Sequence, residues 1–140
     1  MHIVGYQFPE EQTAKYDADW LRVAVTVKHP KANWHFTDSC LLTWELQELG
    51  RWLGCIGRGE VERRTLSFTE PNIAFELLPP SGESDTLRIS FTNESAPPFL
   101  KGDNRYEGFG IDLPLADLDL NAAADAIRLQ AQAFPTRAGH

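Results

Sequence analysis

The side chains that could hold a metal ion are few, and their spacing does not match a metal site. The chain has four histidines, and none belongs to a His-Glu-x-x-His or Cys-x-x-Cys motif. His35, Asp38 and Cys40 come closest to a cluster of ligands. We expect His35 instead to be a partly exposed strand residue opposite Trp34 and Phe36. The sequence therefore predicts no metal and no cofactor.

Residues that could act as nucleophiles also lack the partners that such chemistry needs. No serine lies in a Gly-x-Ser-x-Gly motif, and neither cysteine has a histidine partner in a recognisable context. A helix N-terminus near Cys40 could lower the pKa of its thiol, but a small apolar side chain that fills a gap is the better interpretation. Gly54, Gly57 and Gly59 follow a helix instead of opening one, so they form no phosphate loop. Carboxylates are plentiful, yet the sequence does not show which of them converge. We predict no catalytic residue and no enzymatic activity.

Alternation of apolar and polar residues predicts most of the strands. It is clearest over residues 20–29, where apolar side chains occupy every second position. After a turn at residues 31–33, the run 34–36 is expected to return as a short hairpin partner. The other expected strands are residues 2–8, 66–68, 73–78, 87–91 and 109–115. The strand 73–78 is expected to end at the run from Pro79 to Gly82.

Two segments have the periodicity of amphipathic helices. Residues 41–56 place leucines at three- and four-residue steps. Asp38 or Ser39 is expected to cap the start of this helix, and Gly57 to end it in a left-handed conformation. A second helix is expected over residues 121–134. Residues 58–64 read as an exposed loop, and the longer loop 96–108 as the most mobile part of the chain.

These elements predict a single α+β domain over residues 1–135, with a flexible tail at 136–140. Strands joined by short turns form antiparallel sheets, and alternation along each strand leaves one face for the helices to cover. The expected fold is a two-layer antiparallel sheet of about six to seven strands with two helices on one face, in the order β-β-β-α-β-β-β-β-α.

Charge and cysteine usage limit the partners and the location. The 140 residues carry a net charge of −7. This charge disfavours nucleic acid and anionic membranes, and it either attracts a basic partner or only keeps the protein soluble. Across a helical segment Cys40 and Cys55 would lie about 22 Å apart, whereas a disulfide needs about 6 Å. Free thiols, the lack of a signal peptide and the lack of a long apolar run predict a cytoplasmic protein.

Two surface features suggest that the chain binds another protein. On the first helix Trp44 falls opposite the leucine face and shares its side with Glu48 and Arg51. Either a loop of the same chain covers this tryptophan, or a partner does, since Trp and Arg are favoured interface anchors.

The second feature is a concentration of acids towards the C-terminus, opposed there only by Arg105. Asp117 and Asp119 can simply offset a helix dipole, while the others would suit a basic ligand. We name Trp44, Glu48, Arg51, Asp103, Glu107 and Asp117 as the candidate partner surface. The full set of acids is Asp103, Glu107, Asp112, Asp117, Asp119 and Asp125.

Several runs resemble a known family. The chain contains Tyr-Asp-Ala-Asp-Trp-Leu at 16–21, Trp-His-Phe at 34–36, Leu-Thr-Trp-Glu-Leu-Gln-Glu-Leu at 42–49, Trp-Leu at 52–53 and Leu-Ser-Phe-Thr-Glu-Pro-Asn at 66–72. Together they resemble the WapI-type immunity proteins of bacterial contact-dependent toxin systems. The motifs are mostly core and turn patterns, and we know of no catalytic residue in the family to carry over.

The resemblance implies a cytoplasmic bacterial protein that neutralises a cognate toxin, often a nuclease domain, by binding it. The acidic balance is compatible with this, because RNA-cleaving domains are commonly basic. Two alternatives stay open. One is a small-molecule-binding or enzymatic domain with its site under the loop 96–108, and the other is a structural homodimer. The sequence does not decide between a monomer and a homodimer.

Overall fold

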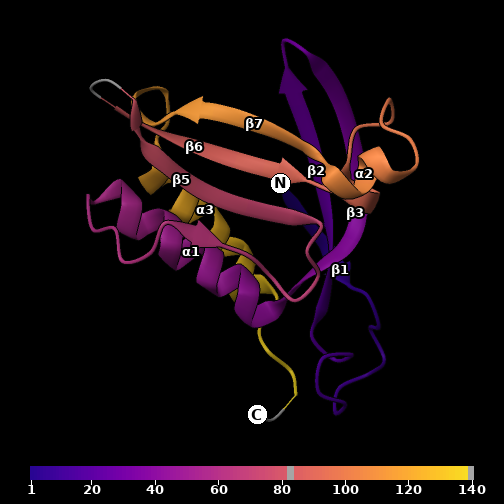
Figure 1. Cartoon of the computed structure of the whole chain (residues 1–140). Coiled ribbons are helices and arrows are strands. Elements are labelled where there is room, and N and C mark those ends of the chain that lie inside the picture. Colours follow the sequence, from indigo (N-terminus) through magenta and orange to yellow (C-terminus); the bar gives the residue numbers. More distant parts are fainter. Residues whose placement is uncertain (82–83, 139–140) are drawn as a thin grey trace.

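A short strand and a long β-hairpin begin the fold and are followed by a helix, a second sheet and a closing helix (Figure 1). The computed structural model describes residues 1–81 and 84–138. A three-stranded antiparallel sheet has the order β1-β2-β3, and a four-stranded antiparallel sheet has the order β4-β5-β6-β7. The elements are β1 (His2–Tyr6), β2 (Trp20–His29), β3 (Ala32–Leu42), α1 (Thr43–Gly57), β4 (Thr65–Leu66), β5 (Ile73–Ser81), β6 (Ser84–Phe91), α2 (Asp103–Glu107), β7 (Phe109–Pro114) and α3 (Leu120–Ala133).

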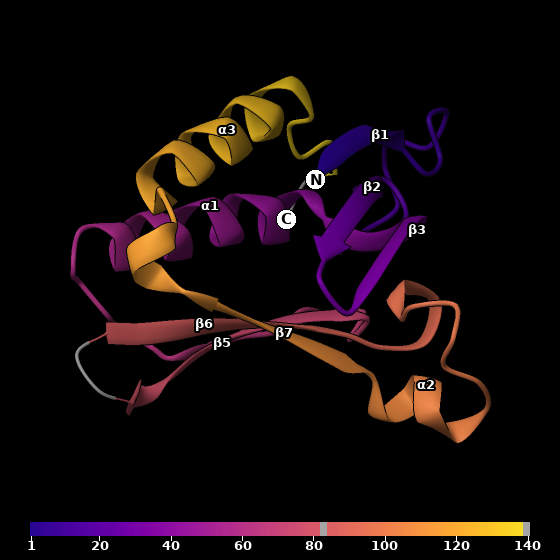
Figure 2. The same ribbon diagram turned by 90° about the horizontal axis from the view of Figure 1, so that it is seen from above.

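The predicted α+β class is confirmed, but the strands divide into two sheets instead of one. In Figure 2, α1 lies between α3 and the four-stranded sheet, and the three-stranded sheet stands at one end of this pair of layers. The two long helices therefore share one side of the second sheet, as expected. The sequence analysis missed the short helix α2 between β6 and β7.

The hairpin of β2 and β3 is longer than its sequence pattern suggests. Pairing runs from Trp20 opposite Leu42 to His29 opposite Ala32, so β3 spans eleven residues instead of the three predicted. The error lies at its end, where Cys40, Leu41 and Leu42 are all buried. A continuous apolar run is compatible with a buried strand end or with a helix face.

Helix α1 consequently starts two residues later than predicted, with Leu42 as its N-cap. Neither Asp38 nor Ser39 caps it. Instead the carboxylate of Glu45, in the third helical position, accepts the backbone N–H of Leu42 at 2.9 Å. This is the reciprocal half of a capping box, which satisfies an N–H group that the helix itself leaves unpaired.

Glycines on α1 allow it to approach α3 closely. A Cβ on Gly57 would lie 2.6 Å from Oδ1 of Asn121, at the start of α3, and one on Gly50 would lie 3.3 Å from Ile127. Gly57 is thus the last helical residue, and it is not the left-handed terminator that we predicted. The left-handed conformation occurs at Gly59, with φ of +77°.

Two strand boundaries in the second sheet also differ from the predictions. Strand β5 continues through Pro79 to Ser81 instead of ending at the prolines. The two prolines are tolerated because neither has a ladder partner: the pairing with β6 is irregular between Leu78 and Ser81, and β4 pairs only with Phe75 and Glu76. At the other side, β7 ends at Pro114.

The segment 96–108, predicted as the most mobile loop, is organised around one guanidinium group. Arg105 of α2 donates hydrogen bonds to four backbone carbonyls, those of Asn93, Ala96, Pro97 and Leu100, at 2.6 to 3.0 Å. These bonds fold the segment back onto the end of β6.

The chain near the C-terminus is hydrogen-bonded into the fold, which corrects the expected free tail for residues 136–138; residues 139 and 140 lie outside the described part. The fully buried Asp19 accepts the N–H groups of Arg137 (2.6 Å) and Ala138 (3.2 Å) and the hydroxyl of Thr43 (3.2 Å). The Arg137 guanidinium also packs on the ring of Tyr6.

Replacing Asp19 with Ala should destabilise the protein by about 3 kcal/mol, because three donors would lose a buried charged acceptor. Urea unfolding measures the loss. Asp17→Ala is the matched control, since Asp17 is exposed. Equal unfolding midpoints for the two variants would contradict the role given to Asp19.

Both cysteines are free, as predicted, although Cys40 lies in β3 and not in the helix. Burial, assisted by the nearby Asp38 charge, raises the pKa of the Cys40 thiol to about 12. This is the opposite of the lowered pKa that a helix N-terminus could have produced, and it leaves Cys40 as a packing residue.

At pH 8 a thiol-specific disulfide reagent should therefore react with Cys55 alone in the folded protein, and with both cysteines in urea, because the thiolate is the reactive form. Absorbance of the released reagent measures the stoichiometry. Folded Cys55→Ser should show almost no reaction. A full equivalent from that variant under native conditions would show that Cys40 is accessible.

Candidate protein-binding surface

Trp44 lies in the first turn of α1 and is half-buried. Tyr16, from the loop between β1 and β2, meets it edge to face with ring centroids 5.7 Å apart. A loop of the same chain therefore covers part of the tryptophan, which was one of the two possibilities left open. The rest of the ring lines two surface hollows, one beside Tyr16 and Thr136 and the other beside Glu48.

Hydrogen bonds to the carboxylate of Glu11 stabilise the conformation of the loop that contains Tyr16. Glu11 accepts the N–H groups of Thr13 and Ala14 at 2.8 and 2.9 Å, and also the hydroxyl of Thr13. These bonds favour the charged carboxylate and lower the pKa of Glu11 to about 2, the Ala14 bond contributing most. Tyr16 itself adopts a φ of +71°, a conformation that a non-glycine residue rarely takes without such support.

Glu48, one turn after Trp44, lies between two guanidinium groups. It pairs with Arg51 on the same helix and with Arg63 from the loop that follows α1. Side chains of the two arginines are 65% and 51% exposed, so each keeps donors available to a partner. Arg63 was not predicted, because a loop has no periodicity; its backbone carbonyl accepts the indole N–H of Trp52 at 3.0 Å.

These side chains line a shallow groove between α1 and the start of the second sheet, with a volume of about 610 Å³. The groove combines two aromatic rings, an amide and two carboxylates with two guanidinium groups. We call it the Trp44 surface and define it as Trp44, Gln47, Glu48, Arg51, Arg63 and Phe68. The sequence prediction thus placed Trp44, Glu48 and Arg51 together, as the structure does.

The predicted acids do not join this surface. Asp103 and Glu107 lie on α2, whereas Asp117 lies in the turn before α3, and these two elements are at opposite ends of β7 (Figure 2). Asp117 precedes the part of α3 that packs on Gly57, so it lies near the far end of α1, about 20 Å along the helix from Trp44.

Three of the other acids already have roles within the chain. Asp112 forms a two-bond pair with Arg88 at 2.6 and 2.9 Å, and Asp125 pairs with Arg128. Asp119 caps α3 by accepting the N–H of Ala122. The acids of the C-terminal half therefore do not form one patch.

No group of three or more His, Cys, Asp and Glu residues among 1–81 and 84–138 is placed to hold a metal ion. Asp38, one of the three residues closest to a cluster in sequence, instead accepts a hydrogen bond from Asn72 at 2.7 Å. None of the helices in that part of the chain has the length and apolarity needed to cross a membrane.

A cavity with mostly apolar walls lies away from the place where the small-molecule alternative put its site. It has a volume of about 320 Å³ and lies between the two sheets and the helices, and no residue of 96–108 lines it. Lys28 is the one charged side chain among the described residues around it. Titratable groups do not converge there, as a general acid–base site would require.

Comparison with known proteins identifies the family of the chain. No curated protein and no solved structure matches the chain. The model of the immunity protein WapI-like family matches residues 1–135. This match covers all seven strands and the three helices, together with the Trp44 surface. The chain therefore belongs to the immunity protein WapI-like family.

Proposed function

We propose that this protein neutralises a cognate toxin by binding it through the Trp44 surface, without catalysis. The observation on which the proposal depends is the grouping of a half-buried tryptophan with two exposed arginines at one groove. Trp and Arg are the residues most often found as interface anchors. The family membership favours a protein toxin as the partner.

The geometry of the groove suits binding because its anchors are held before a partner arrives. Tyr16 restricts Trp44 from one side, and Glu48 restrains both Arg51 and Arg63. An exposed ion pair adds little to folding stability, but it positions the guanidinium groups and so lowers the entropy lost on binding.

The charge of the protein supports a basic, nuclease-type toxin met in the cytoplasm. A net charge of −7 attracts a basic domain before the two proteins are in contact. Asp103, Glu107 and Asp117 lie away from the groove, so in this proposal they raise the association rate and do not anchor the complex.

Trp44→Ala should weaken binding of the cognate toxin by about 2 kcal/mol, or roughly 30-fold, because an anchor of the groove is truncated. Calorimetric titration with the toxin domain encoded beside the gene measures the affinity, and co-expression measures rescue of growth. Leu129→Ala is a control for truncation of an exposed apolar side chain, since Leu129 lies on α3 and outside the groove.

Equal affinities for Trp44→Ala and Leu129→Ala would contradict the proposed surface. A change in mass by light scattering in Trp44→Ala, with toxin affinity unchanged, would identify the groove as a self-association surface instead.

Neutralising the three outlying acids together, as Asp103→Asn, Glu107→Gln and Asp117→Asn, should slow association severalfold at low salt and leave dissociation unchanged. Trp44→Ala should instead speed dissociation. Stopped-flow or surface-based kinetics at two salt concentrations separates the effects. Faster dissociation of the triple variant would show that these acids make direct contacts.

A further inference from the structure

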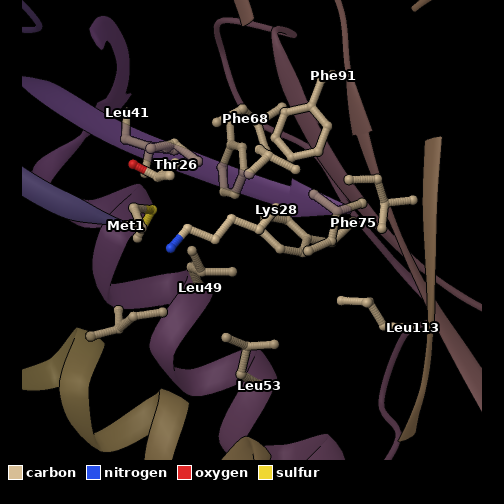
Figure 3. Close-up of a pocket in the computed structure, with 16 residues that line it drawn as sticks. Met1, Thr26, Lys28, Leu41, Leu49, Leu53, Phe68, Phe75, Phe91 and Leu113 are labelled. Atoms are coloured by element: carbon tan, nitrogen blue, oxygen red, sulfur yellow. The ribbon is translucent and has the colours of Figure 1, made fainter. Parts of the chain in front are cut away.

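The cavity between the sheets and the helices has the size and lining of a ligand pocket. Its volume of about 320 Å³ lies within the usual range of small-molecule sites, roughly 300 to 1,000 Å³. Every layer of the fold contributes an apolar wall residue (Figure 3). These include Val27 of β2, Leu53 of α1, Ile127 of α3, Phe75 of β5, Ile89 of β6 and Ile111 of β7.

The polar groups at this cavity are few and lie on one side of it. Figure 3 shows the ammonium of Lys28 and the hydroxyl of Thr26 on the side where Met1 lies. The two residues are separated by one position in β2, so their side chains project to the same face of the strand. A pocket with apolar walls and a few grouped polar atoms orients a ligand that has one polar end.

The charge of that polar end follows from Lys28. No Asp or Glu is among the residues around the cavity, and Lys28 takes part in none of the ion pairs within residues 1–81 and 84–138. Its aliphatic stem can lie along the apolar wall while the ammonium stays at the opening. The Lys28 ammonium, together with the α-ammonium of the neighbouring Met1, makes this edge of the apolar pocket cationic and favours a ligand with a negatively charged end.

We propose that the cavity binds a monocarboxylate with a hydrocarbon body, of the fatty-acid type. The carboxylate pairs with the Lys28 ammonium and accepts the Thr26 hydroxyl, and the hydrocarbon lies among the wall residues. Phe68 lines both this cavity and the groove of the Trp44 surface, but Lys28 and Thr26 lie outside that groove, and the test of this site needs no toxin.

The test titrates decanoate into the wild-type protein and into Lys28→Met, with calorimetry as the readout. Decanoate should bind the wild type with one site, and Lys28→Met should bind it about tenfold more weakly, because the charged hydrogen bond is lost. Lys31→Met is the matched control: Lys31 is also exposed, lies in the turn of the same hairpin and is outside the cavity. It should bind decanoate as the wild type does.

Two further experiments test whether the charge of the ligand matters and whether the ligand lies in the cavity. Decanol, which has a similar body but no charge, should bind the wild type about tenfold more weakly than decanoate. Leu113→Trp, at a half-buried wall position, should unfold cooperatively and lose decanoate binding because its ring occupies the cavity. If Leu113→Trp does not fold, the comparison of Lys28→Met with Lys31→Met decides the outcome, because both substituted residues are exposed.

Absence of decanoate binding to the wild type would overturn the proposal. Equal binding of decanol and decanoate would also overturn it, as would equal losses in Lys28→Met and Lys31→Met.

Discussion

A single buried carboxylate, that of Glu45, joins the two sheets at the start of α1. Its Oε2 accepts the N–H of Leu42, where the first sheet ends, and its Oε1 accepts the N–H of Thr69, in the segment that leads to β5. Both partners are backbone donors that would otherwise lack an acceptor in a poorly solvated place. Glu45 therefore adds a fixed hydrogen-bonded link to the apolar core that packs the second sheet on α1, and this link lies beside the groove between them.

Glu45 and Asp19 together explain why Trp44 faces outward. Thr43 donates its N–H and its hydroxyl to Asp19, and Glu45 is turned inward to Leu42 and Thr69. Both sequence neighbours of Trp44 are hydrogen-bonded on the buried side of α1. The side chain of Trp44 therefore lies on the outer side of the helix. The outward direction of the half-buried Trp44 side chain is thus a consequence of buried hydrogen bonds made by its neighbours.

The sequence predicted correctly the elements that have a regular apolar pattern. It did not predict the contacts between segments that are distant in the chain. Alternation identified β2, β5, β6 and β7, and helical spacing placed Trp44, Glu48 and Arg51 on one face of α1. The apolar run from Cys40 to Leu42 misled the prediction, because strand ends and helix faces have the same composition there.

The separation into two sheets depends on which strands pair, and the two-residue β4 has too little sequence to show it. Arg63 joins the groove only through the fold of a loop, and the acids that are neighbours in sequence are separated by the length of β7. Neither outcome leaves a periodic signal in the sequence.

The two proposed sites lie on opposite faces of α1, and this limits how they can influence each other. Trp44, Glu48 and Arg51 face solvent, while Leu49 and Leu53 line the cavity. Coupling between the sites would require a second arrangement of α1, or of the Phe68 side chain that lines both sites, that one ligand prefers. The close packing of Gly50 and Gly57 against α3 leaves little space for α1 to shift towards that helix. A bound carboxylate should accordingly raise the stability of the fold by mass action, because it binds only the folded state. Any effect on the affinity of the Trp44 surface for its partner would then pass through Phe68, which lines both sites.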